Sequence, residues 1–394
     1  MIEKENYTEK FVENCVQKSA EKSQESKIKK SAKESVCNDK KIKILFVTNH
    51  FQFVDGVAKC LLNLANNLDI EKFEVTVVAL FAVDQKFVAQ LSPDVKFVSV
   101  FKKYFRGLSK LVGLVPQRLL YKILVKEKYD FEVAYQAGAP TKLLAYSTNT
   151  SAVRYAFMHI FVDNEKKYHA RYDKIIPIAQ SLAERYKQQV TFPQKVETVY
   201  NIFDTDKIIR DSKEFAVEKK RFTIVTACRL SPEKGLERLL VTHKKLLKNG
   251  FEHDLWLVGG GKLESELKNK IEQLNIASSV TMWGAQRNPY PYIASANLYV
   301  CSSFDEGLNT ACVEATVCGV PIVTTNVSGA FEIVQEHSVG MVVTSDEDGL
   351  YYGLQTAISQ PEMMEKWKSN IPQAQEFWKK DNAIKNIEKL FSNQ

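Results

Sequence analysis

The chain has 394 residues, of which 45% are hydrophobic, so it is long enough for two domains that each bury an apolar core. Its net charge of +7 suits anionic ligands or an anionic membrane surface, but no nucleic-acid-binding motif accompanies the charge, so nucleic acid is not an expected partner. The sequence has no run of about eighteen apolar residues, which argues against a transmembrane span.

Cysteine usage bears on the cellular compartment. The seven cysteines are scattered, and they form neither a C-x-x-C pair nor a His/Cys cluster at zinc spacing. Such a pattern is typical of buried free thiols in a reducing cytoplasm. The N-terminus is charged and has no apolar signal core. We therefore expect a cytoplasmic protein with free thiols and no metal site.

The first half of the chain begins with a tail and continues as a Rossmann-like fold. Residues 1–41 are rich in Lys, Glu, Ser and Gln, and too few are large and apolar to order the segment, so a disordered charged tail is predicted. A strand at Ile42–Thr48, a loop at Asn49–Gly56, a helix near Val57–Leu68 and a strand at Phe73–Leu80 follow. Further strands are predicted at Glu132–Tyr135, Arg154–His159 and Ile175–Ala179.

One stretch of the first half, 102–128, is basic and apolar at once. Its only acidic residue is Glu127. A helix that lies on a membrane surface has this composition. An amphipathic helix of the domain with a solvated basic face has it too, and the sequence leaves both interpretations open. The basic residues are Lys102, Lys103, Arg106, Lys110, Arg118, Lys122, Lys126 and Lys128.

The second half follows a charged segment, 204–220, that is predicted to be a linker. A strand at Phe222–Cys228 leads into the string RLSPEKG, which contains Arg229 and Lys234. Two cations at the end of a strand could hold a diphosphate that gains negative charge as a glycosidic bond breaks. Read alone, the R-x-x-x-x-K spacing is also compatible with an ordinary basic turn.

A glycine-rich turn comes next. Gly259–Gly261 lie between a strand at Asp254–Val258 and a helix at Leu263–Leu274. Glycines at such a turn are a weak nucleotide-binding signal, and often they only permit a tight turn. A strand at Val280–Gly284 follows. Its end, Met282–Gly284, could flank a nucleotide base, unless Trp283 is simply a core residue.

The most informative stretch is 302–329, SSFDEGLNTACVEATVCGVPIVTTNVSG. It predicts a polar turn after a strand at Leu298–Cys301, a helix at about Asn309–Cys318 and a strand at Ile322–Thr325. In an open α/β sheet such a turn lies at the carboxyl end of its strand, where ligands bind. The N–H groups from Gly307 to Thr310 suit an anion such as a diphosphate.

Two carboxylates, Glu306 and Glu314, bracket this anion site. Carboxylates repel phosphate, but they accept short hydrogen bonds from hydroxyl groups. A ligand with a diphosphate between two polyols is a nucleotide sugar. The alternative is that Glu306 caps the helix and Glu314 is a solvated helix residue.

The strings EGLNTACVEA and GVPIVTTNVSGAFEIV resemble the donor motif of glycosyltransferase family four, whose members are retaining enzymes of the GT-B fold. RLSPEKG is similar to the family's diphosphate-binding motif. The resemblance implies catalytic roles for Arg229 and Lys234 at the diphosphate and for Glu306 at the donor sugar, with Glu314 on the ribose hydroxyls. The donor-binding residues that it implies are Gly307, Leu308, Asn309, Thr310, Glu314, Gly259, Gly261 and Gly284.

The resemblance also covers the first half of the chain. It implies that His159 is a catalytic residue near the sugar and that Gly56 and Asp163 lie on the acceptor side. Family members often have Gly-Gly where this chain has Asp55-Gly56. The implied architecture is α/β and GT-B, with two Rossmann-like domains facing each other across a cleft: an acceptor domain at 42–203, a nucleotide-sugar-binding domain at 221–372, and a C-terminal helix at 373–394 that crosses back to the first domain.

The implied activity is transfer of a hexosyl or N-acetylhexosaminyl group, with retention and without a metal, to a glycan or lipid-linked acceptor in polysaccharide or glycoconjugate synthesis. UDP is the preferred nucleotide of the donor, and no cofactor is expected because the nucleotide sugar is a substrate. The expected location is the cytoplasm, with the inner face of the membrane open as a site of peripheral contact. The rival functions are a sugar-nucleotide epimerase and a non-catalytic partner subunit on the same fold.

Overall fold

The computed structural model describes residues 40–52, 56–101, 112 and 114–392. The predicted tail at 1–41, except for its last two residues, lies outside the described residues, as does Asp55. The chain divides into two compact units. Unit 1 is formed by the residues up to Ile178, by Tyr186–Ile202 and by the residues from Ile384 onward, and unit 2 by Ala179–Arg185 and Phe203–Ala383.

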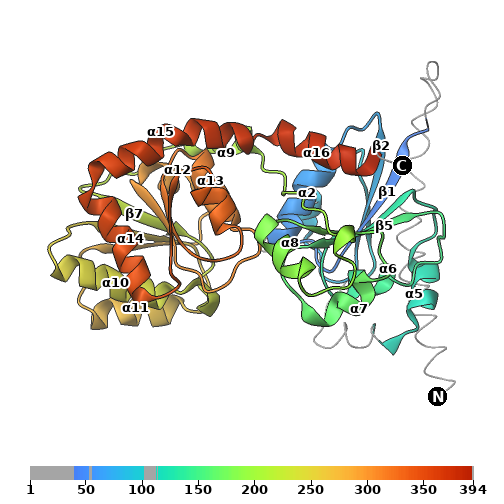
Figure 1. The fold of residues 1–394 in the computed structure, drawn as a ribbon, viewed down its shortest axis with the longest axis horizontal. Helices are drawn as coiled ribbons and strands as arrows, with labels where there is room; N and C mark the ends of the chain where they lie inside the picture. The colour runs from blue at the N-terminus through green and yellow to red at the C-terminus, as the bar shows by residue number, and fades with distance from the viewer. Residues whose placement is uncertain (1–39, 53–55, 102–111, 113, 393–394) are drawn as a thin grey trace. The chain divides into compact units, whose positions relative to one another are not determined.

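Unit 1 contains six parallel strands in the order β3-β2-β1-β4-β5-β6 (Figure 1). They are β1 (Ile42–Thr48), β2 (Phe73–Ala79), β3 (Lys96–Ser99), β4 (Phe131–Ala134), β5 (Val153–Met158) and β6 (Lys174–Pro177). The central strands are runs of buried residues because elements cover both faces of a parallel sheet. The helical segments of unit 1 are α2 (Gly56–Asn67), α3 (Gln85–Val88), α5 (Gln117–Leu124), α6 (Ala139–Leu144), η2 (Asp163–Glu165), α7 (Lys166–His169) and η3 (Pro193–Lys195). Most of α8 (Gln180–Lys187) belongs to unit 2.

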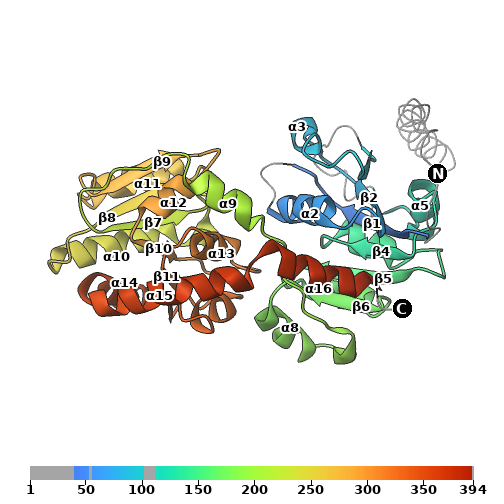
Figure 2. The same ribbon diagram turned by 90° about the horizontal axis from the view of Figure 1, so that it is seen from above.

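The end of the chain packs on this sheet. The region of the predicted C-terminal helix, 373–394, contains the end of α15 (Pro361–Phe377) and α16 (Lys380–Ser392). The ring of Phe391 lies edge-on to Phe131, with 5.2 Å between the ring centroids. The hydroxyl of Tyr155 donates a hydrogen bond of 3.2 Å to the carbonyl of Leu390. The last turns of α16 therefore belong to the core of unit 1, and Figure 2 shows α16 beside these strands.

Unit 2 repeats the same sheet. Its six parallel strands lie in the order β12-β11-β10-β7-β8-β9. They are β7 (Thr223–Ala227), β8 (Asp254–Val258), β9 (Val280–Gly284), β10 (Leu298–Cys301), β11 (Ile322–Thr325) and β12 (Gly340–Val343). The other elements of unit 2 are α9 (Thr205–Ser212), η4 (Pro232–Lys234), α10 (Leu236–Lys248), α11 (Glu264–Gln273), α12 (Tyr290–Ser295), α13 (Thr310–Val317), the π-helix η5 (Phe331–Gln335) and α14 (Glu347–Ser359), together with α15.

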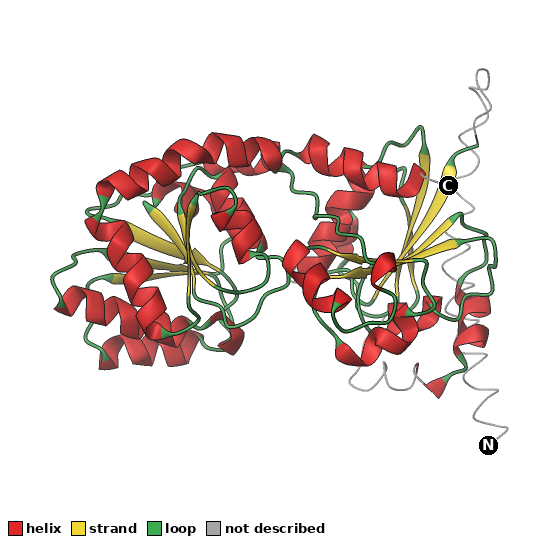
Figure 3. Cartoon of the chain, in the orientation of Figure 1, coloured by secondary structure: helices red, strands yellow, loops and turns green. Residues whose placement is uncertain are grey.

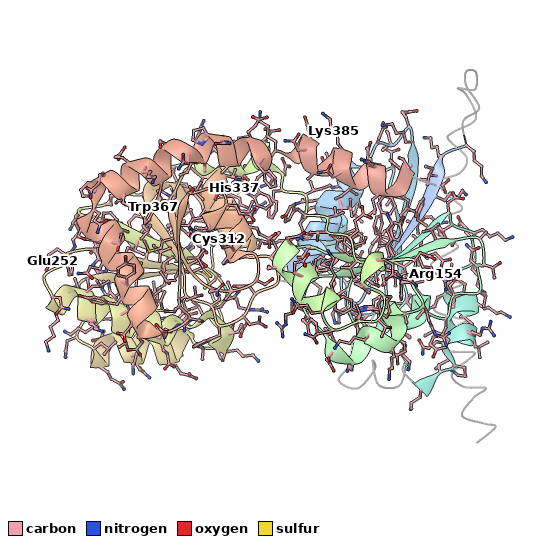
Figure 4. All side chains as sticks on the ribbon, viewed as in Figure 1. Arg154, Glu252, Cys312, His337, Trp367 and Lys385 are labelled. Carbon is pink, nitrogen blue, oxygen red and sulfur yellow. The ribbon has the colours of Figure 1, made fainter. Side chains whose placement is uncertain are left out.

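Two layers of helices cover the sheet of unit 2. Helix α10 packs against α11 and α14, and helix α13 packs against α9, α12 and α15. Figure 1 shows these two groups on opposite faces of the strands, and Figure 3 shows the strands between them in yellow. The core includes Leu239 of α10, Val300 of β10 and Trp367 of α15. Figure 4 labels Trp367.

Both sheets have the strand order 3-2-1-4-5-6 when the strands are counted within each unit, which is the order of the doubly wound dinucleotide-binding fold. The prediction of two Rossmann-like α/β domains is thus confirmed. In such a sheet the connections leave in opposite directions from the first and fourth strands, so a crevice opens beyond their carboxyl ends. These switch points lie at β1 and β4 in unit 1, and at β7 and β10 in unit 2.

The segment predicted to be a linker, 204–220, contains a helix. Asp204 caps α9, because its side chain accepts a hydrogen bond of 3.2 Å from the N–H of Lys207. Ile208 is buried, and α9 packs against α12 and α13. Residues 205–212 are therefore packed against unit 2, although their composition alone suggested an unstructured connection.

Candidate active site

Two loops meet at the switch point of unit 2. One runs from Cys228 to Gly235 after β7, and the other from Ser302 to Asn309 after β10. Gly235 has a φ of +62°, and a Cβ atom there would lie 2.2 Å from the carbonyl oxygen of Ser302. Only glycine permits both this backbone conformation and this approach, so the last glycine of RLSPEKG brings the two loops into contact.

Three hydrogen bonds join these loops. The N–H of Phe304 donates to the carbonyl of Glu233 at 2.8 Å, and the hydroxyl of Ser302 donates to the carbonyl of Lys234 at 2.8 Å. The ammonium of Lys234 donates to Oε1 of Glu306 at 2.6 Å. Two predicted catalytic residues that stand 72 positions apart in the chain are therefore in direct contact.

The pair formed by Lys234 and Glu306 is largely shielded from water, with side-chain exposures of 18% and 15%. Oε1 of Glu306 also accepts a hydrogen bond of 2.6 Å from the hydroxyl of Ser303. Burial alone lowers the pKa of Lys234, but the carboxylate of Glu306 raises it by more, and the net shift is upward. The pair therefore presents a fixed ammonium, which suits an anionic ligand, beside a carboxylate, which suits a hydroxyl group.

Arg229 is held more loosely. Its side chain is 69% exposed, and Nη2 lies 3.4 Å from Oε1 of Glu233 in the same loop. The hydroxyl of Ser231 also donates a hydrogen bond to that oxygen. This bond is the largest of the contributions that lower the pKa of Glu233. An exposed ion pair of this kind contributes little, so the guanidinium can leave Glu233 for a stronger anion. The structure does not bring Arg229 against Glu306.

The amino end of α13 lies directly after Glu306. Asn309 caps this helix: its Oδ1 accepts a hydrogen bond of 3.4 Å from the N–H of Cys312, a residue that Figure 4 labels. The interpretation that Glu306 caps the helix is therefore wrong. Leu308 is buried, and a Cβ atom on Gly329 would lie 3.0 Å from its Cδ1, so its side chain is part of the packing. The free N–H groups at this end, including that of Thr310, favour an anion.

Glu314 lies about one turn further along α13. Its Oε1 accepts a hydrogen bond of 3.2 Å from the hydroxyl of Tyr290, the first residue of α12. Burial, and then the carboxylate of Glu314, raise the pKa of Tyr290, so the phenol keeps its proton. The alternative that Glu314 is a solvated helix residue is therefore wrong. The sequence analysis did not identify Tyr290, although its place at a helix start after Asn-Pro was a usable signal.

The predicted donor-binding glycines have a packing role. A Cβ atom on Gly259 would lie 1.9 Å from the carbonyl oxygen of Cys228, and one on Gly261 would lie 2.3 Å from that of Leu230. Both glycines therefore let the 259–261 turn lie against the loop that carries Arg229. Gly284 has a φ of +67°, and its carbonyl accepts a hydrogen bond of 2.8 Å from the N–H of Gly259.

Trp283 precedes Gly284 at the end of β9. Its ring centroid lies 5.8 Å from that of Trp256 and 4.9 Å from that of Tyr292. These contacts pack the half-buried ring of Trp283 against its aromatic neighbours. They leave the backbone at Gly284 as the part of this segment that could flank a base.

The remaining predicted residues belong to unit 1. His159 follows β5 directly and is buried, with its ring centroid 4.9 Å from that of Tyr135. Burial lowers the pKa of His159 to about 4, against the opposing effect of a hydrogen bond to the backbone of Tyr135, so the imidazole is neutral near pH 7. Asp163 is exposed and pairs with Lys166 at 2.6 Å. Gly56 is exposed and begins α2.

A buried carboxylate that the sequence analysis missed organises the switch point of unit 1. Glu165 is 5% exposed and accepts hydrogen bonds from the N–H of Gly138 and, at 3.2 Å, from the hydroxyl of Thr141. Nδ2 of Asn49, after β1, donates to the carbonyl of Ala137 at 2.6 Å. The loops that follow β1, β4 and β5 are thus bonded to one another. No sequence pattern distinguishes Glu165 from a surface residue.

The comparisons with known proteins agree with this geometry. Residues 207–374 match the family model described as glycosyl transferases group 1. Over 288 residues the chain is 27% identical to the N-acetylgalactosamine-N,N'-diacetylbacillosaminyl-diphospho-undecaprenol 4-alpha-N-acetylgalactosaminyltransferase of Campylobacter jejuni, a match that covers 71% of this chain and 77% of that one. It is also 27% identical to an uncharacterized glycosyltransferase of Haemophilus influenzae, over 82% of this chain and 92% of that one.

Among solved structures, the fold is similar to that of Anabaena HepE in complex with UDP and glucose. The TM-score is 0.71 at 19% sequence identity, and the match covers 90% of this chain and 100% of that one. At this identity the likeness bears on the fold alone. It confirms the predicted GT-B class for the two parallel-sheet units.

Proposed function

Because residues 207–374 match the family model of the group 1 glycosyl transferases, we propose that the chain is a retaining glycosyltransferase that moves a sugar from a UDP-linked donor to a lipid-linked glycan. The observation that carries the proposal is the buried contact between Lys234 and Glu306, 2.6 Å long, beside the amino end of α13. A cation and free N–H groups at this place suit an anion, and the carboxylates on either side suit hydroxyl groups.

In the proposed complex the diphosphate lies over the amino end of α13, with Lys234 and Arg229 around it. Glu306 accepts hydrogen bonds from the sugar, and Glu314 accepts them from the ribose. The bond between the anomeric carbon and the leaving phosphate oxygen breaks, and the acceptor oxygen bonds to that carbon on the same face. The leaving oxygen takes the acceptor proton. Charge grows on the diphosphate in this step, and the fixed ammonium of Lys234 stabilises it.

The donor and acceptor classes rest on the relatives. The Campylobacter enzyme is named for an acceptor linked to undecaprenol through a diphosphate, and for transfer of an N-acetylgalactosaminyl group in the alpha configuration. The Anabaena structure holds UDP and glucose. We carry over only the chemical classes: a UDP-linked hexose or N-acetylhexosamine as donor, and a lipid-linked or related glycan as acceptor in polysaccharide or glycoconjugate synthesis.

The first test is nucleotide binding, followed by transfer. UDP should raise the melting temperature of the protein more than GDP or ADP does. UDP-linked Glc, Gal, GlcNAc and GalNAc are then offered with undecaprenyl-diphosphate-linked acceptors, and radiolabel in the lipid phase is counted. The anomeric configuration of the product is read by NMR. Label that stays in a new soluble nucleotide sugar without acceptor would favour an epimerase, and an absence of any UDP effect would favour a non-catalytic subunit.

Metal independence is a consequence of the proposed site. Lys234, Arg229 and the amino end of α13 supply the positive charge that a divalent cation supplies in other transferases. We expect the transfer rate in excess EDTA to stay within about twofold of the untreated rate, since the loss of one essential charge would lower it about a hundredfold. Restoration of a chelated enzyme by Mn²⁺ or Mg²⁺, but not by buffer alone, would contradict this expectation.

Peripheral contact with an anionic membrane is proposed for the basic stretch 102–128, of which residues 112 and 114–128 are described. Helix α5 buries Leu120 and Tyr121, and the hydroxyl of Tyr121 donates to Glu132 at 2.5 Å. Arg118 and Lys122 are exposed, as is Leu114 one turn earlier. None of the helices in the described part of the chain is long and apolar enough to cross a membrane. Basic and apolar groups exposed together suit an interface.

We therefore expect salt-sensitive sedimentation of the protein with vesicles that contain anionic lipid. Each basic residue near such a surface contributes about 1 kcal/mol, so changing Arg118 and Lys122 to serine should weaken binding by roughly tenfold or more. The matched control changes the exposed residues Lys248 and Lys262 of unit 2 to serine, which alters the net charge equally. Equal binding by the two double variants would show that α5 is only a solvated domain helix.

A further inference from the structure

Arg238 lies in the first turn of α10, four residues after Lys234. Its guanidinium donates hydrogen bonds to backbone carbonyls. The residue is 9% exposed. Its Nη2 donates to the carbonyls of Ser302 at 2.5 Å and Ser303 at 3.1 Å, and its Nη1 donates to the carbonyl of Ser345 at 2.5 Å. One side chain therefore binds the loop after β10 and the loop between β12 and α14 together.

The ring of Phe304 lies against the same guanidinium, whose central carbon is 4.1 Å from the ring centroid. Phe304 is 57% exposed. Its backbone N–H donates to the carbonyl of Glu233, and its ring is held by the contact with Arg238. Only arginine combines a planar face for an aromatic ring with several donors in a fixed fork. Lysine at this position would supply a charge without that geometry.

The carbonyls that Arg238 binds lie three and four residues before Glu306, which is the partner of Lys234. The short loop from Ser302 to Glu306 is thus held at its beginning by Arg238, together with the hydroxyl of Thr325, which donates to the carbonyl of Ser303 at 2.6 Å, and at its end by Lys234. Both cations come from the same turn region, on either side of Gly235. A change at Arg238 is therefore transmitted to Glu306 along four residues of backbone, without contact between Arg238 and the proposed ligand.

Glu314 has an anchor outside this loop. Its partner Tyr290 belongs to α12, and the start of its helix is fixed by Asn309. Loss of Arg238 should accordingly disturb the sugar end of the site, where Glu306 lies, while leaving the ribose end in place. The two ends can be measured separately. UDP contains the ribose but no donor sugar, so UDP binding reports on the ribose end, whereas turnover also depends on the sugar end.

We propose that Arg238 is a positioning residue that clamps the 302–306 loop so that Glu306 and Lys234 meet the donor in register. The proposal rests on the proposed glycosyltransferase function for its kinetic consequence only. Misplacement of reacting groups by about 1 Å lowers a rate by about a hundredfold. We expect Arg238→Met to lower kcat about thirtyfold, with the donor KM and the Kd of UDP changed by less than about threefold, and Arg238→Lys to recover part of the rate.

The experiment measures kcat, KM, UDP affinity and UDP stoichiometry by calorimetry, so that a loss of folded protein appears as a lower stoichiometry. Arg221→Met is the matched control, because Arg221 also bridges two segments, through Glu252 at 2.7 Å and Asp254 at 2.8 Å, but lies at the other end of the sheet. Its rate should stay within about twofold of wild type. The double variant Lys234→Ala/Arg238→Met should have a kcat less than about threefold below that of Lys234→Ala alone.

Hydrogen exchange of the peptide 302–308 tests the clamp without any assay of transfer. Arg238→Met should exchange there at least about tenfold faster than wild type and Arg221→Met. A wild type that transfers no sugar would contradict the proposed function, while the exchange result would still decide the clamp. Unchanged exchange, an unchanged kcat at full UDP stoichiometry, or multiplicative rates in the double variant would each overturn the role of Arg238.

Discussion

Replacing Lys234 with alanine should lower kcat about a hundredfold, whereas replacing Glu314 with alanine should act mainly on the donor KM. The ammonium of Lys234 is held 2.6 Å from Glu306 before any ligand arrives, so it need not reorganise when charge develops on the diphosphate. Interactions that strengthen in the transition state raise kcat. By analogy with the loss of an oxyanion-hole donor, the loss of this cation is worth about 3 kcal/mol.

In the proposed complex Glu314 binds the ribose hydroxyls, which do not change during the reaction, so it should contribute equally to the ground state and the transition state. A hydrogen bond to a charged group is worth about 1.5–3 kcal/mol, which predicts a rise in KM of roughly tenfold to a hundredfold for Glu314→Ala. In that variant Tyr290 also loses its partner, and Tyr290→Phe should show a smaller effect in the same direction. Glu306→Ala should affect both parameters, because Glu306 holds Lys234 and is proposed to bind the sugar as well.

The measurement is steady-state transfer from the true donor, with circular dichroism to confirm that each variant is folded. Lys245→Ala is the matched control, since Lys245 lies on α10, the helix that follows Lys234, but pairs with Asp348 at an exposed position. It should behave as wild type. If Lys234→Ala and Glu306→Ala both keep near wild-type kcat/KM, the assignment of the site is wrong even though the fold stands.

The sequence predicted the central strands well because each is a short apolar run that is buried on both faces. The bounds predicted at Ile42–Thr48, Asp254–Val258 and Leu298–Cys301 are those of β1, β8 and β10. One edge strand of each sheet, β3 in unit 1 and β12 in unit 2, was not predicted. β12 begins at Gly340, which packs against β11 so closely that a Cβ atom would lie 1.8 Å from the carbonyl oxygen of Ile322. A glycine at that position reads as a strand break in the sequence.

The candidate site was only partly predictable, for a different reason. Motif residues such as Lys234 and Glu306 could be named, but their contact depends on the approach of two loops at Gly235, which no local pattern encodes. Arg238 and Tyr290 were not identified at all. Arg238 acts through backbone carbonyls, which every residue possesses, so its partners carry no side-chain signature. Side chains that organise a site through the backbone become visible only when the loops are placed in space.

The stability of unit 2 should fall as the pH is lowered from 7 to 5, because two histidines are buried there in neutral form. Nδ1 of His243 lies 2.7 Å from Nε2 of His253, and Nε2 of His243 lies 2.8 Å from the hydroxyl of Ser279. Nδ1 of His253 donates to the carbonyl of Phe251 at 2.8 Å. With both rings neutral, each ring nitrogen of His243 and His253 has a hydrogen-bond partner. Both side chains are buried, so there is no solvent to stabilise an added proton.

Burial, and then the neighbouring His253, lower the pKa of His243 to about 3, and burial also lowers the pKa of His253. An unfolded histidine has a pKa of about 6.5. Between these values the unfolded state binds more protons than the folded state, so the stability present above about pH 6.5 is lost as the pH falls. At pH 5, His243 alone should reduce the free energy of unfolding by about 2 kcal/mol relative to pH 7, and His253 acts in the same direction.

All four tryptophans, Trp256, Trp283, Trp367 and Trp378, lie in unit 2, so their fluorescence during urea denaturation reports on this unit. The wild-type midpoint should move to lower urea between pH 7 and pH 5. His243→Gln should be less stable at pH 7 but flatter in its pH dependence. The matched control is His169→Gln, which removes a histidine of unit 1 whose pKa burial lowers to about 4 and should leave the fluorescence slope unchanged. A wild-type slope retained in His243→Gln would show that other groups govern the acid sensitivity of unit 2.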